Sequence, residues 1–402
     1  MSAPALIRQQ PDTDLGAAAA VLSVDLAAVA ANCRLLAARA AGELMAVVKA
    51  DGFGHGAAAV ARTALDNGAT WLGVTALSEG LALREAGLPA PLLSWLNPLG
   101  ADFAAAVQAG IDLAVPSIAH LDAIAGAYPD RPARVHLHLD TGLARDGAPP
   151  EEWAALCRSA RLAEARGQLR VVGVMGHLAR SDEPGHPANA AGRAAFDRGL
   201  RIARALGLRP VHRHLAATAA TLADPLAHHT MVRVGAGLVG IDPSGSTTLH
   251  PAMTLTAPVV SVRRVAAGTG VGYGHTWVAP QPTTLALLPV GYADGLPRVA
   301  SGRAEVLLAG RRCPVVGRIS MDQVVVDVGP DRTVAVGETA TVLGTGAGGA
   351  PTAAEWAAWS QTLEHEVVTG LGSAPARVLR RTTPPTTAPS PAASPTSPRS
   401  TR

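Results

Sequence analysis

From about residue 44 to residue 240, short apolar runs alternate with segments of helical spacing, and this alternation limits the possible folds more than any other feature. The strand candidates, in order, are LMAVVK, WLGVTAL, PLLSWL, DLAVPS, RVHLHLD, LRVVGVMGHL, VHRHLA and MVRVG. The segments between them are rich in alanine and often end in glycine, a common helix stop. Eight such alternations predict a (β/α)8 barrel with active residues at the carboxyl ends of its strands. A doubly wound open sheet is the alternative, because the same alternation suits it.

The chain changes character after about residue 250. Its apolar runs become β-branched and are separated by Gly and Pro, as in TLTAPVVSVRRV, TTLALLPVG, AEVLLAG, CPVVGRIS, QVVVDV and ATVLG. These runs predict a second, mainly β domain. A further strand at residues 20–24 precedes the eight and is followed by a helix that Asp25 initiates. This strand is a candidate to pair with the β domain.

The expected domain organisation is a flexible N-terminus at 1–18, a barrel at 19–250, a β domain at 251–381 and a disordered tail at 382–402. The tail consists of Pro, Ser, Thr and Arg with hardly an apolar side chain. Burial therefore cannot offset the entropy that ordering this segment would cost.

Composition excludes several classes of function. The 34 basic and 31 acidic residues leave a formal charge of +3 without a basic block, so we expect no nucleic-acid partner. Cys33, Cys157 and Cys313 are widely separated and form no CxxC, which disfavours a disulfide framework and a zinc site and favours a reducing cytoplasm. No apolar run is long enough to span a membrane, and acidic residues precede the run at 15–24, unlike in a signal peptide.

Lys49 is the only lysine in the chain, because every other basic residue among the 34 is arginine. A genome that favours arginine codons explains why lysines are rare, but it does not explain why this one remains. Arginine can replace lysine in a salt bridge or a phosphate contact. It cannot form an imine, because its guanidinium stays protonated. The lone lysine therefore indicates Schiff-base chemistry at Lys49.

The segment AVVKADGFGHG at residues 46–56 places Lys49 at the end of a predicted strand, which is the barrel mouth, before a glycine-containing loop. This segment resembles the cofactor-lysine motif of alanine racemases. Members of that family are fold type III enzymes that carry pyridoxal 5′-phosphate (PLP) and combine a barrel with a β domain. The resemblance covers about residues 20–380 and rests on several motifs in the family's order.

The barrel motifs of the resemblance supply three cationic or basic side chains. Arg145, in DTGLARDG, matches the arginine that helps to bind the substrate carboxylate in the family. His177, in MGHLARSD, matches the family's histidine. Arg233, in MVRVGAG, matches the arginine that faces the pyridine nitrogen of the cofactor. Such an arginine stays charged and disfavours protonation of the ring, so side reactions such as transamination should be suppressed.

The β-domain motifs of the resemblance supply the remaining residues. VGYGHTW places the catalytic tyrosine of the family at Tyr273. PVGYADGLPR contains Tyr292, which lines the substrate entrance in the family. RISMDQ contains Met321 and Asp322, and the first of these offers a backbone N–H to the substrate carboxylate.

Racemisation itself requires two bases, because a proton leaves one face of a planar intermediate and another arrives on the opposite face. PLP acidifies Cα by drawing charge into the imine and the ring. Lys49 can serve one face, and the resemblance assigns Tyr273 to the other. A free tyrosine has a pKa of about 10, so it needs help to act near neutral pH. Nearby cationic or hydrogen-bonding groups such as His177 and Arg233 are candidates to lower the pKa of this tyrosine.

The phosphate of PLP is expected at the loops that follow the last two barrel strands. In this sequence the candidates are Thr218 and the backbone N–H groups of Gly235 and Ala236. We assign the cofactor itself to a set that combines these residues with barrel and β-domain positions: Lys49, Phe53, His177, Thr218, Arg233, Gly235, Ala236 and His365.

Several positions depart from the commonest pattern of the family. Phe53 and His365 stand where tyrosines are frequent, and Ala217 and Thr218 stand where Asn-Ser is common. Each lost tyrosine hydroxyl commonly reaches the phosphate, so cofactor affinity should fall unless His365 supplies a replacement donor. His138 occupies a site that is often a carbamylated lysine fixing the substrate arginine. We therefore expect either the rate of racemisation or the preference for a substrate side chain to differ from that of the commonest family members.

Alanine is the leading substrate, with serine or a broader range of small amino acids as the alternative. A non-catalytic PLP carrier on the same barrel is a second hypothesis, which the β domain argues against. A metal-dependent barrel hydrolase is a third, motivated by the HxH pairs His136/His138 and His212/His214. The resemblance also implies a cytoplasmic homodimer in which Tyr273 and Met321 of one subunit meet the lysine of the other, and a role in supplying D-alanine for peptidoglycan precursors.

Overall fold

The computed structural model describes residues 19–127, 131–373 and 378–384, and its first domain is a closed barrel of eight parallel strands. The strands are β2 (Glu43–Val47), β3 (Trp71–Val74), β4 (Leu92–Ser94), β5 (Asp112–Val115), β6 (Ala133–His138), β7 (Leu169–Met175), β8 (His212–His214) and β9 (Met231–Val234). Strand β9 pairs in parallel with β2 and so closes the barrel. The barrel prediction is confirmed, and the open-sheet alternative is wrong, because an open sheet has two unpaired edges.

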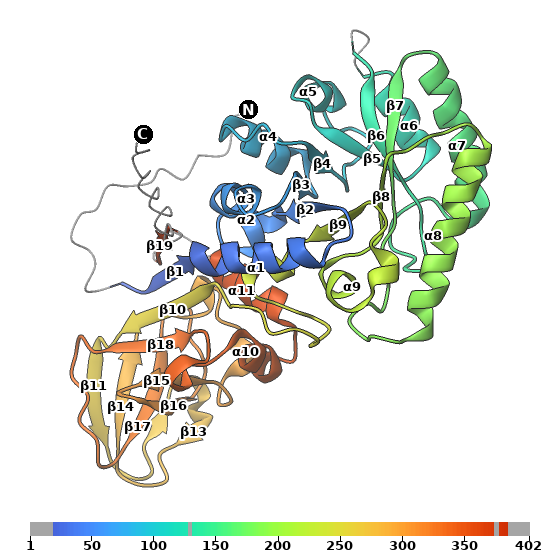
Figure 1. Ribbon diagram of the computed structural model, residues 1–402. Helices are drawn as coiled ribbons and strands as arrows, with labels where there is room; N and C mark the ends of the chain where they lie inside the picture. The colour runs from blue at the N-terminus through green and yellow to red at the C-terminus, as the bar shows by residue number, and fades with distance from the viewer. Residues whose placement is uncertain (1–18, 128–130, 374–377, 385–402) are drawn as a thin grey trace, which may run out of the picture.

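The barrel is covered by one helix that precedes its first strand and by helices that follow its strands (Figure 1). They are α1 (Leu26–Arg39), α3 (Ala57–Leu65), α4 (Leu77–Glu85), α5 (Phe103–Gln108), α6 (Ile118–Ala125), α7 (Pro150–Ala165), α8 (Pro187–Ala205) and α9 (Thr218–Ala223). Asp25 is the N-cap of α1, as expected, and its carboxylate accepts hydrogen bonds from the N–H groups of Ala27 and Ala28. One apolar core fills the space between helices and strands, and a smaller cluster that includes Met45, Trp71 and Met231 lies apart from it.

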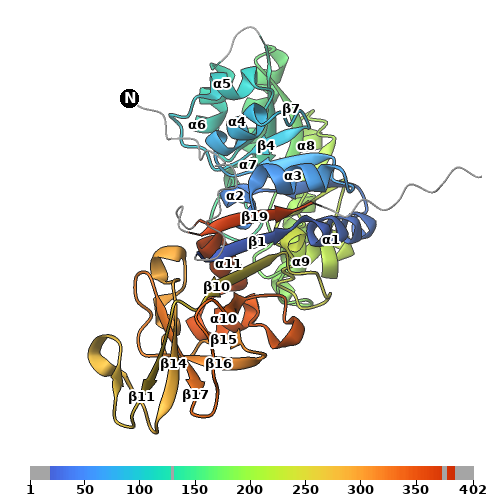
Figure 2. The same ribbon diagram turned by 90° about the vertical axis from the view of Figure 1, so that its left-hand side faces the viewer.

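The second domain is built on a nine-stranded sheet in the order β11-β14-β17-β16-β15-β18-β10-β1-β19. Its strands are β1 (Val21–Asp25), β10 (Met253–Pro258), β11 (Ser261–Val265), β14 (Thr283–Leu288), β15 (Glu305–Leu308), β16 (Arg311–Val316), β17 (Val324–Gly329), β18 (Thr339–Leu343) and β19 (Leu379–Thr383). Strand β1 pairs antiparallel with β10 and parallel with β19, so the two ends of the described chain lie side by side in this sheet (Figure 2).

The segment boundaries expected at the two chain ends can be compared with the structure. Residues 382 and 383, which the sequence assigned to the tail, lie in β19, where they pair with β1. The expected flexible N-terminus at 1–18 and the remainder of the tail from residue 385 onward lie outside the described residues.

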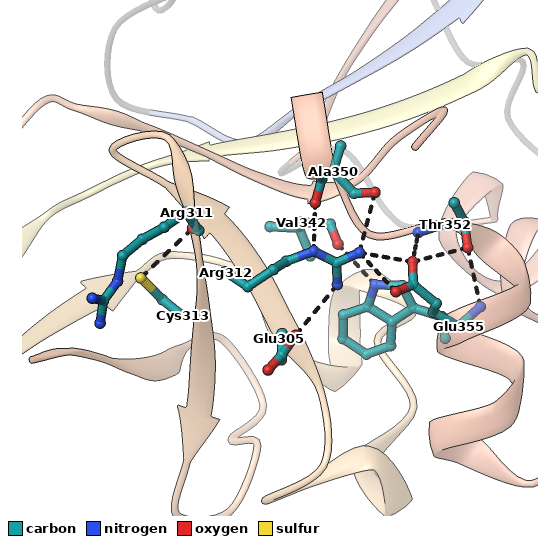
Figure 3. A network of polar contacts seen from close by, with 10 residues as sticks. Glu305, Arg311, Arg312, Cys313, Val342, Ala350, Thr352 and Glu355 are labelled. Atoms are coloured by element: carbon teal, nitrogen blue, oxygen red, sulfur yellow. Dashed lines mark hydrogen bonds and ion pairs between the residues drawn. The ribbon is translucent and has the colours of Figure 1, made fainter. Parts of the chain in front are cut away.

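Two helices, α10 (Ala353–Ser360) and α11 (Glu364–Gly372), follow β18 and pack against each other. Figure 3 shows Arg312 of β16 between Glu305 and Glu355, with its guanidinium 2.7 and 2.9 Å from the two oxygens of Glu355. The same carboxylate accepts the N–H of Thr352, the N-cap of α10, at 2.8 Å. Arg312 therefore ties the sheet to the first turn of α10 through a capping box.

Helix α11 lies between the β sheet and the barrel in both views (Figures 1 and 2) and packs on the short helical turn α2 (Lys49–Phe53). The approach is close: a Cβ on Gly372 would lie 2.1 Å from the Cα of Gly54. Both positions therefore require glycine, and the β domain touches the barrel at the segment that carries Lys49. Within the described residues, no helix combines the length and the apolar character that crossing a membrane would need.

Candidate active site

Lys49 does not end a strand, as the sequence suggested, because β2 stops at Val47 and Lys49 opens the turn α2. The turn is left-handed: Ala50, Asp51 and Phe53 have φ of 51°, 53° and 57°. Each such non-glycine residue costs about 1–2 kcal/mol relative to a right-handed conformation. Neighbouring elements must therefore hold the turn in place.

Three elements hold this left-handed turn. The N–H of Ala50 donates to a carboxylate oxygen of Glu79 on α4 at 2.6 Å. Asp51 accepts the N–H of Ala57 at 2.8 Å with one oxygen, and with the other it lies 2.6 Å from a guanidinium nitrogen of Arg380 on β19. Arg380 also donates to the carbonyl oxygen of Gly54 at 3.1 Å. The last strand of the chain thus clamps the loop that follows the lysine.

The environment of Lys49 favours a neutral amine. Burial lowers the pKa of Lys49 below its usual value of 10.5, the positive charge of Arg145 lowers it further, and Arg233 acts in the same direction. Only the charge of Glu79 opposes these effects. The Nζ atom lies 6.0 Å from the centre of the Phe53 ring. Lys49 is accordingly a better nucleophile and base near neutral pH than an exposed lysine would be.

Arg233 lies on β9 in the barrel interior with only 4% of its surface exposed. Its Nη1 donates to the Nδ1 of His214 at 3.0 Å and to the His214 carbonyl at 2.7 Å. Its Nη2 donates to the Gly176 carbonyl at 2.7 Å and to the Nδ1 of His177 at 3.2 Å. The Nε–H has no hydrogen-bond partner among the described residues, so it is the donor left for a ligand.

The charges of Arg233 and His177 differ at neutral pH. Burial lowers the pKa of Arg233 from 12.5 to about 10, so the guanidinium remains protonated. Burial, and then the charge of Arg233, lower the pKa of His177 from 6.5 to about 3, so this imidazole is neutral. Because Arg233 only donates, the Nδ1 of His177 accepts and the proton sits on Nε2. His177 therefore acts on a neighbour as a hydrogen-bond donor and not as a cation. Of the two roles that the sequence left open for it, cationic or hydrogen-bonding, the structure supports the hydrogen-bonding one.

The candidate phosphate residues meet where α9 and the 3-10 helix η2 (Ala236–Val239) begin. The hydroxyl of Thr218 accepts the N–H groups of Gly235 and Gly237 at 3.3 and 3.2 Å. The first N–H groups of both helices have no intrahelical acceptor, which suits an anion. A Cβ on Gly235 would lie 2.7 Å from the Phe53 ring, so Phe53 closes one side of this corner.

Two positions that depart from the family pattern lie against each other. The rings of Phe53 and His365 have centroids 6.0 Å apart, and His365 is on α11. Burial, followed by the charge of Lys49, lowers the pKa of His365 below its usual value. Ala217, a third departure, is the N-cap of α9 and makes no side-chain cap. The structure thus places His365 against Phe53, where the charge of Lys49 acts on it, and leaves the α9 N–H groups without a side-chain cap.

Arg145 lies at the same mouth, since its charge acts on both Lys49 and His177. Its neighbour Asp146 is 3.4 Å from the Nδ1 of His138, and this contact lowers the pKa of Asp146. His138 therefore contacts the segment that carries Arg145, the candidate substrate arginine.

The β-domain candidates are exposed. Tyr273, in the 3-10 helix η3 (Tyr273–His275), is 72% exposed, Met321 is 53% exposed and Tyr292 is 40% exposed. Met321 and Tyr292 are neighbours, because the N–H of Tyr292 donates to the Ser320 carbonyl at 3.0 Å and the N–H of Ala293 donates to the Met321 carbonyl at 2.9 Å. Figure 1 shows β13 (Trp277–Val278), which follows η3, far from α2. The described chain does not bring Tyr273 to its own Lys49. Asp322 lies beside Met321 in the loop between β16 and β17.

The comparisons with known proteins agree with this geometry. The family model of the alanine racemase N-terminal domain matches residues 24–243, and that of the alanine racemase C-terminal domain matches residues 252–379. This chain belongs to the alanine racemase family. It is 47% identical over 358 residues to an alanine racemase of Salinispora tropica, covering 88% of this chain and 96% of that protein.

Solved alanine racemase structures have the same fold. That of Streptomyces lavendulae superposes with a TM-score of 0.88 at 42% identity, covering 91% of this chain and 97% of the other. That of Bartonella henselae, which has covalently bound pyridoxal phosphate, superposes with a TM-score of 0.82 at 27% identity, covering 91% and 100%.

The residues of this chain fit the PLP on which the alanine racemase family depends. A partly buried amine at the barrel mouth, an arginine with one unused donor, and two helix starts around Thr218 match an aldehyde, a pyridine nitrogen and a phosphate. The metal alternative receives no support, because no three His, Cys, Asp or Glu side chains gather as a metal site in the parts of the chain described.

Sequence reasoning missed three residues of this alanine racemase site. Glu79 and Arg380 hold the lysine turn, and Asp112 contacts His136 in the barrel interior. The HxH spacing did indicate that each histidine pair projects to one face of its strand, but it suggested a metal site. No local pattern marks Glu79 or Arg380, because their partners lie 29 and 329 positions away.

Proposed function

We propose that this chain interconverts L-alanine and D-alanine with PLP carried on Lys49, using Lys49 and Tyr273 as bases on opposite faces. The observation that carries the proposal is the single lysine of the chain, placed at the barrel mouth with a pKa below its usual value. The cofactor supplies an electron sink that acidifies the Cα–H of the bound amino acid. All other steps belong to side chains of this protein.

Lys49 takes or returns the proton on one face. Its amine is neutral more often than that of an exposed lysine, because burial and the charges of Arg145 and Arg233 disfavour the ammonium form. The clamped left-handed turn limits the positions that the amine can reach.

Tyr273 serves the opposite face and comes from a second copy of the chain. Its exposure on the β domain, together with that of Met321, supports a homodimer with shared sites. In this arrangement the Nε2–H of His177 donates to the tyrosine oxygen, and the charge of Arg233 stabilises a phenolate behind it.

Arg233 orients the pyridine ring and suppresses side reactions. Its Nε–H would be the donor that faces the pyridine nitrogen of bound PLP, and the charge of its guanidinium would disfavour protonation of that nitrogen. Thr218, together with the N–H of Gly235 that donates to it at 3.3 Å and the N–H of Ala236, would hold the phosphate, with Phe53 and His365 beside them.

The substrate carboxylate is bound from two sides. Arg145 approaches from the barrel, and the backbone N–H of Met321 approaches from the second copy, next to Asp322. Tyr292 lines the entrance and limits the size of the amino-acid side chain. We place the enzyme in the cytoplasm, where it supplies D-alanine for peptidoglycan precursors.

The test uses purified protein reconstituted with PLP and the Lys49→Ala variant. We expect the wild type to acquire an absorbance band of covalently held PLP, to keep the label on the Lys49 peptide after borohydride reduction, and to racemise L-alanine faster than L-serine. The variant should do none of these. Protein that binds PLP on Lys49 yet racemises no amino acid would be a carrier and would overturn the proposal.

A further inference from the structure

The HxH pairs form a line of hydrogen bonds through the barrel interior. The Nδ1 of His136 lies 2.8 Å from the Nε2 of His214, whose Nδ1 lies 3.0 Å from the Nη1 of Arg233. The Nε2 of His136 lies 3.3 Å from a carboxylate oxygen of Asp112. The two histidines are fully buried, and Asp112 is 3% exposed. We call these four residues the interior relay.

The relay runs from one end of the barrel to the other. Asp112 is the first residue of β5, at the end away from the mouth, whereas His214 is the last residue of β8. Arg134, whose side chain is 44% exposed, donates to the other oxygen of Asp112 at 2.8 Å and so connects this carboxylate to the surface.

Both ends of the relay demand the same direction for every hydrogen bond. A guanidinium only donates, so the Nδ1 of His214 accepts from Arg233 and the proton of His214 sits on Nε2. That N–H donates to the Nδ1 of His136, whose own proton then sits on Nε2 and points to the Asp112 carboxylate. Burial lowers the pKa of both histidines, so both are neutral at pH 7.

Starting from Asp112 leads to the same assignment, because a carboxylate paired with Arg134 accepts and does not donate. A reversed relay would put an N–H of His214 against an N–H of Arg233. Two independent constraints therefore agree on one arrangement of protons.

We propose that Asp112 is a positioning residue for Arg233, acting through His136 and His214. The carboxylate polarises the two neutral imidazoles, which makes the Nδ1 of His214 a stronger acceptor and holds the Nη1 of Arg233 in place. Arg233 makes no contact with a carboxylate of its own among the described residues. The relay is its link to a negative charge.

Strand β7 leaves room for the contact between His136 and His214. Strand β7 lies between β6 and β8, and a Cβ on its Gly173 would lie 2.0 Å from the Nδ1 of His136. A glycine is thus required where the imidazole of His136 crosses β7 to reach His214. The HxH spacing, which suggested metal ligands, instead supplies the two imidazoles of the relay.

The first experiment needs neither cofactor nor substrate. Apoprotein with ¹⁵N-labelled histidine is recorded by long-range ¹H–¹⁵N correlation at pH 7.5, with His136→Gln and His214→Gln spectra used for assignment. We expect both rings to be neutral with the proton on Nε2. A proton on Nδ1 of either ring, or a cationic ring, overturns the proposal whether or not any variant folds.

Matched variants then test Asp112 itself. Asp112→Leu removes the acceptor, Asp112→Asn keeps an amide oxygen without the charge, and Arg134→Gln keeps the carboxylate. We expect the Nε2–H proton of His214 to shift upfield most in Asp112→Leu, less in Asp112→Asn and not in Arg134→Gln. Equal shifts in Arg134→Gln and Asp112→Leu, or no shift in either, contradict the proposal.

The catalytic consequence rests on the proposed function, whereas the tautomers do not. In Asp112→Leu we expect kcat for alanine to fall about tenfold with KM changed less than about threefold, because positioning of Arg233 matters most in the transition state. We also expect more turnovers in which L-alanine leaves as pyruvate and its amino group stays on the cofactor. Gly173→Ala, which displaces His136 sterically, should likewise lower kcat and raise the share of turnovers that release pyruvate. If the wild-type protein shows the predicted tautomers but racemises no amino acid, the proposed function is refuted and the relay is not.

Discussion

The barrel and the β domain present their proposed catalytic residues in opposite ways. In the barrel, Arg233 is 4% exposed and is held by five hydrogen bonds, and the turn after Lys49 is clamped by a strand from the other end of the chain. In the β domain, Tyr273 and Met321 are 72% and 53% exposed.

This difference shows which half of the site one chain can complete. Burial and hydrogen bonds fix the barrel residues before any partner arrives, and they shift the pKa values of Lys49 and His177. No burial of this kind fixes the exposed side chain of Tyr273. Its position becomes fixed only when another surface covers it. We call Lys49, Arg233 and His177 the barrel half of the site, and Tyr273 and Met321 the β half. We infer that the barrel half governs cofactor binding and that the β half contributes to chemistry after assembly.

The strongest test separates the two halves by single substitutions. Lys49→Ala should abolish covalent PLP at the barrel mouth and reduce racemisation by more than about 10⁴-fold, because the chain has no other lysine side chain. Tyr273→Phe should reduce kcat by about 10³-fold with the PLP absorbance unchanged, since it removes one acid–base group. Tyr292→Phe is the matched control and should lose less. Loss of PLP in Tyr273→Phe would contradict the division between the halves.

Mixing the two inactive proteins tests whether the halves meet between subunits. After subunit exchange, half of the dimers are mixed, and each of these has one site with both Lys49 and Tyr273 intact. We expect activity to rise to about a quarter of wild type. Demonstrated exchange without recovery would place both bases in one chain.

Arg380→Ala tests whether the β19 clamp supports the barrel half. Loss of its contacts to Asp51 and Gly54 should free the strained turn, and PLP affinity should fall about tenfold, with faster amide exchange confined to residues 49–56. Arg381→Ala, on the same strand, is the matched control. The same loss in Arg381→Ala would mean that the strand as a whole, and not the clamp, supports the turn.

The buried histidines should make the barrel half sensitive to acid. His177 has a pKa of about 3 in the folded protein against 6.5 unfolded, so below pH 6.5 the unfolded state binds more protons and stability falls. Between pH 7.5 and pH 5, we expect the free energy of unfolding of the apoprotein to fall about 2 kcal/mol less in His177→Gln than in wild type. Urea denaturation measures this, with the exposed His275→Gln as control. Parallel pH profiles for His177→Gln and wild type would contradict the shift.

The smallest expected effect concerns the boundary between the halves. Phe53→Tyr restores a hydroxyl at the corner formed with Gly235 and His365. One added hydrogen bond to the phosphate should tighten PLP binding about threefold by absorbance titration. Unchanged or weaker binding would indicate that His365 already supplies that donor.

Much of this organisation was predictable from local patterns. The eight alternations predicted the barrel, the β-branched runs predicted the second domain, and the lone lysine indicated the cofactor position. These features depend on periodicity and residue chemistry, which short segments contain. The left-handed turn was not predictable, because Ala50, Asp51 and Phe53 do not favour positive φ and adopt it only under contacts from Glu79 and Arg380.

The sequence by itself determined which chemistry is available: one imine-forming side-chain amine at a barrel mouth, and two pairs of histidines that each project to one face of a strand. Only the tertiary structure decided what those histidines do. His136 and His214 are 78 positions apart, and Asp112 is 24 positions from His136. The closed barrel brings them within hydrogen-bond distance, and the fixed donors of Arg233 at one end then set the direction of every bond, which spacing alone cannot specify.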